Sequence, residues 1–196
     1  MRTILLLCLM VGLVGCNESS TGLDKNVINT AYKKCYGYLG DFVKSPSNFK
    51  ISRATPKISF PQDKVVYKNF KESLIDRNTG KISQQNIDEK TRFRQISVDL
   101  DYETKNSDGV FLRENFVCSY IYKLKGNEGS PREIFLTTWE TEDEITNTFI
   151  PLDIGNESNF RMYDKIVKPI SDISSQFTDR DKLLFTNVSF FYKYYN

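Results

Sequence analysis

The strongest constraint on the fold is an alternation of apolar and polar side chains in the middle of the chain. Four apolar residues alternate with four polar ones: Ile96, Val98, Leu100 and Tyr102 against Ser97, Asp99, Asp101 and Glu103. A period of two is typical of a β-strand with one face in the core and the other in solvent. We therefore expect a half-buried strand that begins near Arg94 and has an acidic outer face.

The residues that follow predict a β-hairpin. Asn106-Ser107-Asp108-Gly109 is a turn sequence, and a second strand is expected from Val110 to Leu124. This strand places five residues on one face: Phe116, Cys118, Tyr120, Tyr122 and Leu124. A further turn over residues 126–131 leads to a third antiparallel strand at Glu133 to Trp139.

Helical spacing occurs near both ends of the chain. Asp24 or Asn26 can cap a helix with apolar residues three or four positions apart: Val27, Ala31, Cys35, Leu39 and Phe42. Ser45-Pro46-Ser47 would end this helix. A second apolar stripe extends from Tyr163 to Phe177, with a kink or a new helix at Pro169.

Aromatic and β-branched residues favour strands in three other segments: Phe49 to Ile51 or a little beyond, Val65 to Phe70, and Leu183 to Tyr195. Pro56 and Pro61 restrict the first region to sheet edges and turns. The elements do not alternate regularly as βαβ units. They predict an α+β fold, in which an N-terminal helix packs on an antiparallel sheet and a further helix lies near the C-terminus.

The N-terminus has the pattern of an export signal. Arg2 precedes an apolar run from Ile4 to Val14, which is short for a membrane span and suits a signal peptide. Leu13-Val14-Gly15-Cys16 closes this run, and polar residues follow it. The pattern resembles the lipobox of bacterial lipoproteins, which implies cleavage before Cys16 and diacylglyceryl attachment to its sulfur. An ordinary secretory peptide or an uncleaved anchor is the alternative, but the small Gly15 and the abrupt change in polarity favour cleavage.

The same resemblance divides the chain and implies its location. Residues 1–15 are the expected signal peptide, 16–23 the lipidated cysteine and a polar tether, and 24–196 a single periplasmic domain. Gram-negative lipoproteins kept at the inner membrane tend to have aspartate after the cysteine, so Asn17 implies the outer membrane. Cleavage removes Arg2 and lowers the net charge from +2 to +1. A mature chain that is nearly neutral argues against nucleic-acid binding.

Two cysteines remain in the expected mature domain, Cys35 and Cys118, because Cys8 leaves with the signal peptide and Cys16 carries lipid. An even pair in an oxidising compartment predicts a disulfide between them. The bridge would restrict the unfolded chain by about 4 to 5 kcal/mol. Two buried free thiols or a redox pair are the alternatives, but the spacing of a thioredoxin-like site is absent.

The absence of histidine excludes Ser-His-Asp and Cys-His catalysis and any zinc site built on imidazole. What remains is carboxylate chemistry. Asp99, Asp101 and Glu103 would lie roughly 6 to 7 Å apart along one strand face, where they could bind a hard cation or act as a glycosidase acid and base. We favour a solvated strand face instead, and predict no catalytic residue, no metal and no cofactor.

A second acidic cluster is the candidate partner-binding surface. It combines the single tryptophan with four carboxylates: Trp139, Glu140, Glu142, Asp143 and Glu144. Tryptophan is enriched at binding hot spots, and a charge run of one sign suits a basic partner. The alternative is a charged turn beside a partly buried tryptophan. Tyr192, Tyr194 and Tyr195 would form either an aromatic ligand surface or the two faces of a terminal strand.

Together these features predict a membrane-anchored envelope lipoprotein that acts as a protein-binding module and is not an enzyme. Immunity, inhibitor or exclusion proteins are examples of this class. A structural or accessory component of an envelope assembly or secretion system is the alternative, and a carboxylate-dependent enzyme is the third. The expected partners are a membrane, through the lipid, and a protein, but no nucleic acid.

Overall fold

The computed structural model describes residues 22–43, 49–106, 108–128, 131–141, 144–146, 150–153 and 176–195. Cys16, the expected signal peptide and most of the stripe from Tyr163 to Phe177 lie outside these ranges. The described elements follow this order: α1 (Gly22–Phe42), β1 (Lys50–Ser59), α2 (Asp63–Leu74), β2 (Ile75–Asp76), β3 (Lys81–Ile82), α3 (Gln84–Asp88), β4 (Arg92–Lys105), β5 (Phe111–Leu124), β6 (Glu133–Thr141), β7 (Glu144–Thr146), β8 (Ile150–Asp153) and α4 (Asp179–Tyr195).

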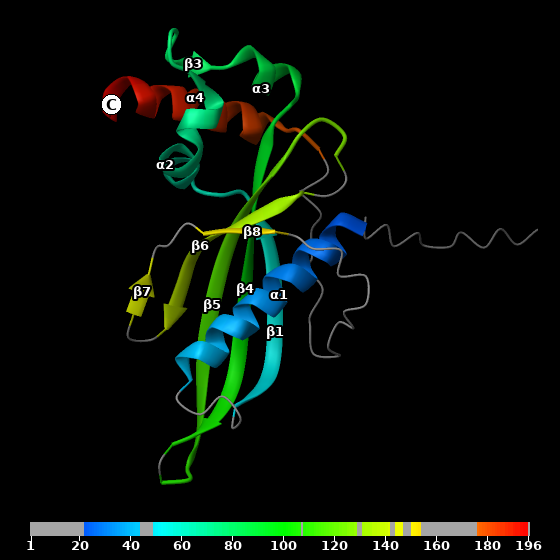
Figure 1. Cartoon of the computed structure of the whole chain (residues 1–196), viewed down its shortest axis with the longest axis vertical. Coiled ribbons are helices and arrows are strands. Elements are labelled where there is room, and N and C mark those ends of the chain that lie inside the picture. The colour runs from blue at the N-terminus through cyan, green and yellow to red at the C-terminus, as the bar shows by residue number, and fades with distance from the viewer. Residues whose placement is uncertain are drawn as a thin grey trace, which may run out of the picture.

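The predicted α+β architecture is confirmed. The described strands form an antiparallel sheet in the order β1-β4-β5-β6-β7, and β8 also pairs with β6. Helix α1 crosses one face of this sheet, whereas α2, α3, α4 and the β2–β3 hairpin gather at one end of the molecule (Figure 1). The turn between β4 and β5 lies at the opposite end (Figure 1).

The predicted β4–β5 hairpin is also confirmed. The two strands pair in antiparallel register from Arg92 opposite Leu124 to Lys105 opposite Phe111. From Ile96 to Tyr102 of β4 the apolar side chains are buried, and the polar side chains between them are partly exposed. Gly109 in the turn has a φ of +79°, a left-handed conformation that glycine adopts without a steric penalty. The third predicted strand is β6.

A first hydrophobic cluster fills the space between α1 and the sheet. The predicted apolar positions of α1 from Val27 to Leu39 are buried, whereas Phe42 in its last turn is exposed. A disulfide joins Cys35 of α1 to Cys118 of β5, with 5.7 Å between the two Cα atoms. The predicted bridge is therefore present, and it fixes the helix against the middle of the sheet.

Strand β1 is longer than the predicted segment from Phe49 to Ile51, since it continues to Ser59. Pro56 lies inside it and pairs with Val98 of β4. Among the described strands, β1 is at the end of the order, where proline is tolerated because one side of the strand makes no ladder hydrogen bonds. The prediction that this region forms a sheet edge is confirmed.

The segment from Val65 to Phe70 was expected to be a strand, and this prediction is wrong because it belongs to helix α2. Val66, Phe70 and Leu74 are buried, and their spacing of four residues defines one face of a helix. The β-branched and aromatic side chains favour strands only weakly, so the burial of this face decides the conformation.

The segment from Leu183 to Tyr195 is likewise a helix, α4, and not the predicted strand. Leu184, Phe185 and Val188 form its buried face. The further helix near the C-terminus is therefore α4, which begins two residues after the predicted stripe ends at Phe177.

Helices α2 and α4 pack together and form a second hydrophobic cluster with the end of the sheet. The Phe70 ring of α2 lies 4.8 Å from that of Phe93 on β4 and 5.3 Å from that of Phe135 on β6. Asp63 at the start of α2 forms an ion pair with Arg180 of α4, at 2.6 Å. The sheet thus has one hydrophobic cluster beneath α1 and another beneath the α2–α4 pair.

Candidate functional site

The end of the β4–β5 hairpin carries the clearest candidate for a binding surface. Three consecutive apolar residues follow the turn, and Val110, Phe111 and Leu112 are 55%, 65% and 40% exposed. The start of β5 lies at the lower end of the molecule, below the last turn of α1 (Figure 1). We call these three residues the hairpin tip.

Local contacts hold the hairpin tip in a defined shape. The side-chain oxygen of Asn106 accepts hydrogen bonds from the backbone N–H groups of Asp108 and Val110, at 3.0 and 2.9 Å. The Lys105 ammonium lies 4.6 Å above the centre of the Phe111 ring. The tip is therefore a defined group of exposed apolar residues, and a cation lies against its one ring, that of Phe111.

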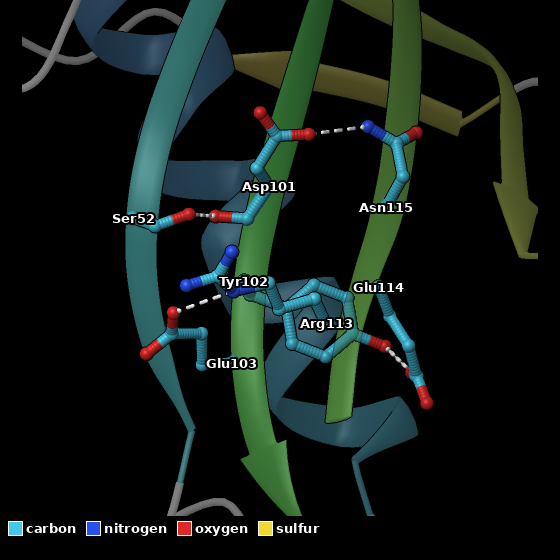
Figure 2. A pocket seen from close by; sticks show the side chains of 7 residues that line it. All are labelled: Ser52, Asp101, Tyr102, Glu103, Arg113, Glu114 and Asn115. Carbon is cyan, nitrogen blue, oxygen red and sulfur yellow. Dashed lines mark hydrogen bonds and ion pairs between the residues drawn. The ribbon is translucent and has the colours of Figure 1, made fainter. Parts of the chain in front are cut away.

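A polar depression of about 510 Å³ lies beside the hairpin tip. Seven residues from β1, β4 and β5 line it: Ser52, Asp101, Tyr102, Glu103, Arg113, Glu114 and Asn115. Figure 2 shows that their side chains interact with one another across the strands. Tyr102 donates a hydrogen bond to the Glu114 carboxylate, and Ser52 donates one to the backbone carbonyl of Asp101, at 3.0 Å.

The carboxylate row from Asp99 to Glu103 takes part in these cross-strand pairs. Asp101 forms an ion pair with Arg53 at 2.8 Å, and Glu103 forms one with Arg113 at 3.0 Å. Asn115 donates hydrogen bonds to both Asp99 and Asp101. Each carboxylate is thus satisfied by a neighbour on the next strand, and the described residues contain no cluster of side chains arranged to hold a metal ion.

A second depression, of about 470 Å³, lies where α2 meets β5 and β6. Its lining combines the aromatic rings of Phe70 and Phe135 with the cations Lys123, Lys125 and Arg132, among other residues. Burial, reinforced by the charge of Lys125, lowers the pKa of Lys123. Lys125 forms an ion pair with Glu89 at 2.6 Å.

The predicted surface around Trp139 is described only in part. Trp139 and Glu140 belong to β6, where their backbones pair with those of Cys118 and Val117, and Glu144 begins β7. Glu142 and Asp143 lie outside the described residues. β6 and β7 pair in antiparallel register, with Glu140 opposite Ile145 and Thr141 opposite Glu144.

The predicted tyrosines belong to α4 and not to a terminal strand. Tyr192 packs into the second hydrophobic cluster, whereas Tyr194 and Tyr195 are 59% and 68% exposed. The tyrosines therefore lie on different faces of one helix.

Sequence reasoning did not single out the hairpin tip, although a signal for it was present. Three apolar residues in a row cannot all occupy the buried face of an alternating strand, so at least one of Val110, Phe111 and Leu112 had to be exposed. Because these residues directly follow Gly109, the sequence also indicates that the exposed ones lie at a turn.

Comparisons with known proteins found no family model, no characterised relative and no solved structure that matches this chain. In the part of the chain that the structure describes, every helix is too short or too polar to cross a membrane.

Proposed function

We propose that this protein is a membrane-anchored envelope lipoprotein whose single domain binds another protein, as an immunity, inhibitor or exclusion protein does. The observation that carries the proposal is the hairpin tip, where Val110, Phe111 and Leu112 are exposed together. A compact group of exposed apolar side chains on an ordered element is typical of interaction sites.

The surroundings of the hairpin tip support protein binding. Complete burial of a fully exposed apolar side chain contributes roughly 1.5 to 3 kcal/mol, and a partner would gain the part of this that corresponds to the 40 to 65% of each residue that is exposed here. Two carboxylates beside the tip are already in ion pairs, Asp101 with Arg53 and Glu103 with Arg113. A partner that covers the tip therefore does not leave these carboxylates buried without a cation. The ion pairs form a polar rim of the kind that surrounds an apolar hot spot.

The β6–β7 hairpin supplies a second part of the proposed interface. β6 is antiparallel to β5, with Glu140 opposite Val117, so it runs toward the same end of the sheet as the hairpin tip. In this proposal Trp139 and the carboxylates Glu140, Glu142, Asp143 and Glu144 recognise a basic region of the same partner. Charge on such a surface chiefly speeds association, and salt weakens it.

The proposed anchor is a lipid on Cys16 at the outer membrane. Five residues separate Cys16 from the first residue of α1, Gly22, and the chain between them spans at most about 20 Å. The domain would therefore stay close to the bilayer. Two or three acyl chains, each contributing about 0.8 kcal/mol per buried methylene, make such an anchor effectively permanent.

The test of protein binding uses the full-length protein, affinity-tagged at its C-terminus and isolated from gently solubilised membranes of its own cells. We expect one protein to be recovered at near-stoichiometric amount with the wild type and at least tenfold less with Phe111→Ser. Ile87→Ser is the matched control, because Ile87 is also exposed, at 46%, but lies in α3 at the other end of the molecule. Equal recovery of every protein with Phe111→Ser and wild type would refute a partner at the hairpin tip.

The test of the anchor is metabolic labelling with a fatty acid. Label should enter the wild-type protein and be absent from Cys16→Ala. Incorporation of the label into Cys16→Ala would refute lipidation at this cysteine.

A further inference from the structure

Helix α4 has a second apolar face, which no described residue covers. Its inner face is buried through Leu184, Phe185 and Val188. Its outer side exposes three large apolar residues, Leu183 at 50%, Phe190 at 52% and Tyr194 at 59%; Tyr195, 68% exposed, lies in line with Val188 at the end of the helix. Positions 183, 190 and 194 are seven and four residues apart, so they lie in one stripe along the helix.

Ring contacts extend this stripe into a continuous aromatic surface. The Phe190 ring lies 4.4 Å from that of Tyr194, and the Phe191 ring lies 6.0 Å from that of Tyr195. Phe191 also contacts Tyr67 of α2, at 5.7 Å between ring centres. The surface therefore crosses from α4 to the adjacent helix.

Both helices that contribute to this aromatic surface also carry lysines. Lys64 and Lys68 on α2 and Lys193 on α4 are exposed, and none of the three has an ion pair with any residue that the structure describes. The Lys193 ammonium lies 5.4 Å from the centre of the Tyr194 ring. Lys71 on α2 lies 5.3 Å from the centre of the Tyr67 ring.

The nearby carboxylates are already paired, so they do not neutralise these lysines. Asp63 binds Arg180, Asp179 binds Lys182, and Asp181 binds the buried Arg94. The α2–α4 surface, which we define as Lys64, Lys68, Leu183, Phe190, Lys193, Tyr194 and Tyr195, is therefore apolar and positively charged.

We propose that the α2–α4 surface lies on an anionic lipid bilayer. Aromatic rings with a polar edge are enriched at the boundary between lipid headgroups and acyl chains, and lysines beside them bind anionic headgroups. None of its residues lines either of the two depressions described above.

This proposal rests on the lipid anchor proposed above, and it orients the domain. Helix α1 begins in the half of the molecule that contains α4, away from the β4–β5 turn (Figure 1). If the anchor and the α2–α4 surface share one bilayer, the hairpin tip points away from it, toward a partner in the periplasm.

The test uses the mature, lipidated full-length protein reconstituted into vesicles of phosphatidylcholine, with or without phosphatidylglycerol. Leu183→Cys carries a nitroxide label, while Cys35 and Cys118 remain bridged. We expect the label's collision ratio for oxygen over a water-soluble nickel complex to rise at least threefold when phosphatidylglycerol is present. Lys64→Glu with Lys68→Glu should abolish the rise, and the control Lys50→Glu with Lys57→Glu, on exposed positions of β1, should preserve it.

Vesicle flotation separates the two proposals in the same sample. Failure of the protein to float with the vesicles would refute the anchor. If the protein floats but the label at position 183 stays equally accessible to nickel in both vesicles, the bilayer contact is refuted. Protection of the label only after addition of periplasmic proteins would also overturn it, in favour of a protein partner at this surface.

Discussion

At the scale of single residues, the most consequential feature is a buried ion pair between the sheet and the last helix. The side chains of Arg94 and Asp181 are 0% and 2% exposed, with 2.6 Å between Arg94 Nη1 and Asp181 Oδ1. Asp181 also accepts hydrogen bonds from the backbone N–H and the hydroxyl of Thr178, at 2.7 and 2.8 Å. Arg94 donates to the backbone carbonyl of Gln176 as well, at 2.8 Å. The pair thus fixes the start of α4 on β4.

Removing one partner of this pair should destabilise the domain strongly, because an unpaired buried charge remains. We predict that Asp181→Ala lowers the free energy of unfolding in urea by about 3 to 5 kcal/mol. The exposed pair of Lys182 with Asp179 is the control, and Asp179→Ala should have little effect. Similar urea midpoints for Asp181→Ala and wild type would show that the pair does not hold α4 in place.

Two glycines provide a second prediction at this scale, since the same substitution should have opposite effects on them. Gly80 has a φ of +65°, which an L-residue adopts at a cost of about 1 to 2 kcal/mol, so Gly80→Ala should destabilise the domain. Gly37 lies on the exposed side of α1, and a Cβ added there meets nothing within 4 Å. Gly37→Ala should therefore stabilise it, by up to about 1 kcal/mol. Thermal unfolding of the two variants checks both signs, and a shift in the same direction for both would contradict the account.

At the scale of elements, the alternating pattern of the sequence was sufficient for the β4–β5 hairpin, because along most of its length only the face beneath α1 is buried, and the other face packs against α2 and α4 at one end. It was not sufficient for α2 and α4. Val66 and Phe70, like Leu184 and Val188, have the spacing of a helix face, but strand-favouring residue types surround them. Tertiary packing between these two helices, which contact each other from distant parts of the sequence, decides their conformation.

The candidate site shows the same limit of sequence reasoning. The acidic face of β4 was predicted from the sequence. Its ion pairs with Arg53 and Arg113 could not be predicted, because they depend on the strand register. Arg92 and Arg94 are in phase with the apolar residues of β4, which is the signal that they are buried. Their partners, the backbone carbonyl of Gly126 for Arg92 and Asp181 for Arg94, follow only from the fold.

The disulfide should account for much of the stability of α1 on the sheet. We predict that the double variant Cys35→Ala, Cys118→Ala loses about 2 to 5 kcal/mol of unfolding free energy, chiefly because its unfolded chain is less restricted. Reduction of the wild type should produce a similar loss, measured by urea unfolding with and without reductant. Equal stability of the oxidised wild type and the double variant would mean that packing alone holds the helix.

At the scale of the whole molecule, the two exposed apolar surfaces lie at opposite ends of the sheet. The α2–α4 surface is at one end and the hairpin tip at the other, with α1 and its disulfide between them (Figure 1). We therefore propose that one end rests on the membrane to which the chain is anchored and that the other binds a protein partner.

Photo-crosslinking in intact cells identifies what each end of the domain contacts. A photoreactive amino acid replaces Phe111 at the hairpin tip or Phe190 on the α2–α4 surface of the full-length protein. The account predicts a covalent adduct with one discrete protein from position 111, and a lipid adduct without a protein adduct from position 190. A protein adduct at position 190 together with none at position 111 would contradict it.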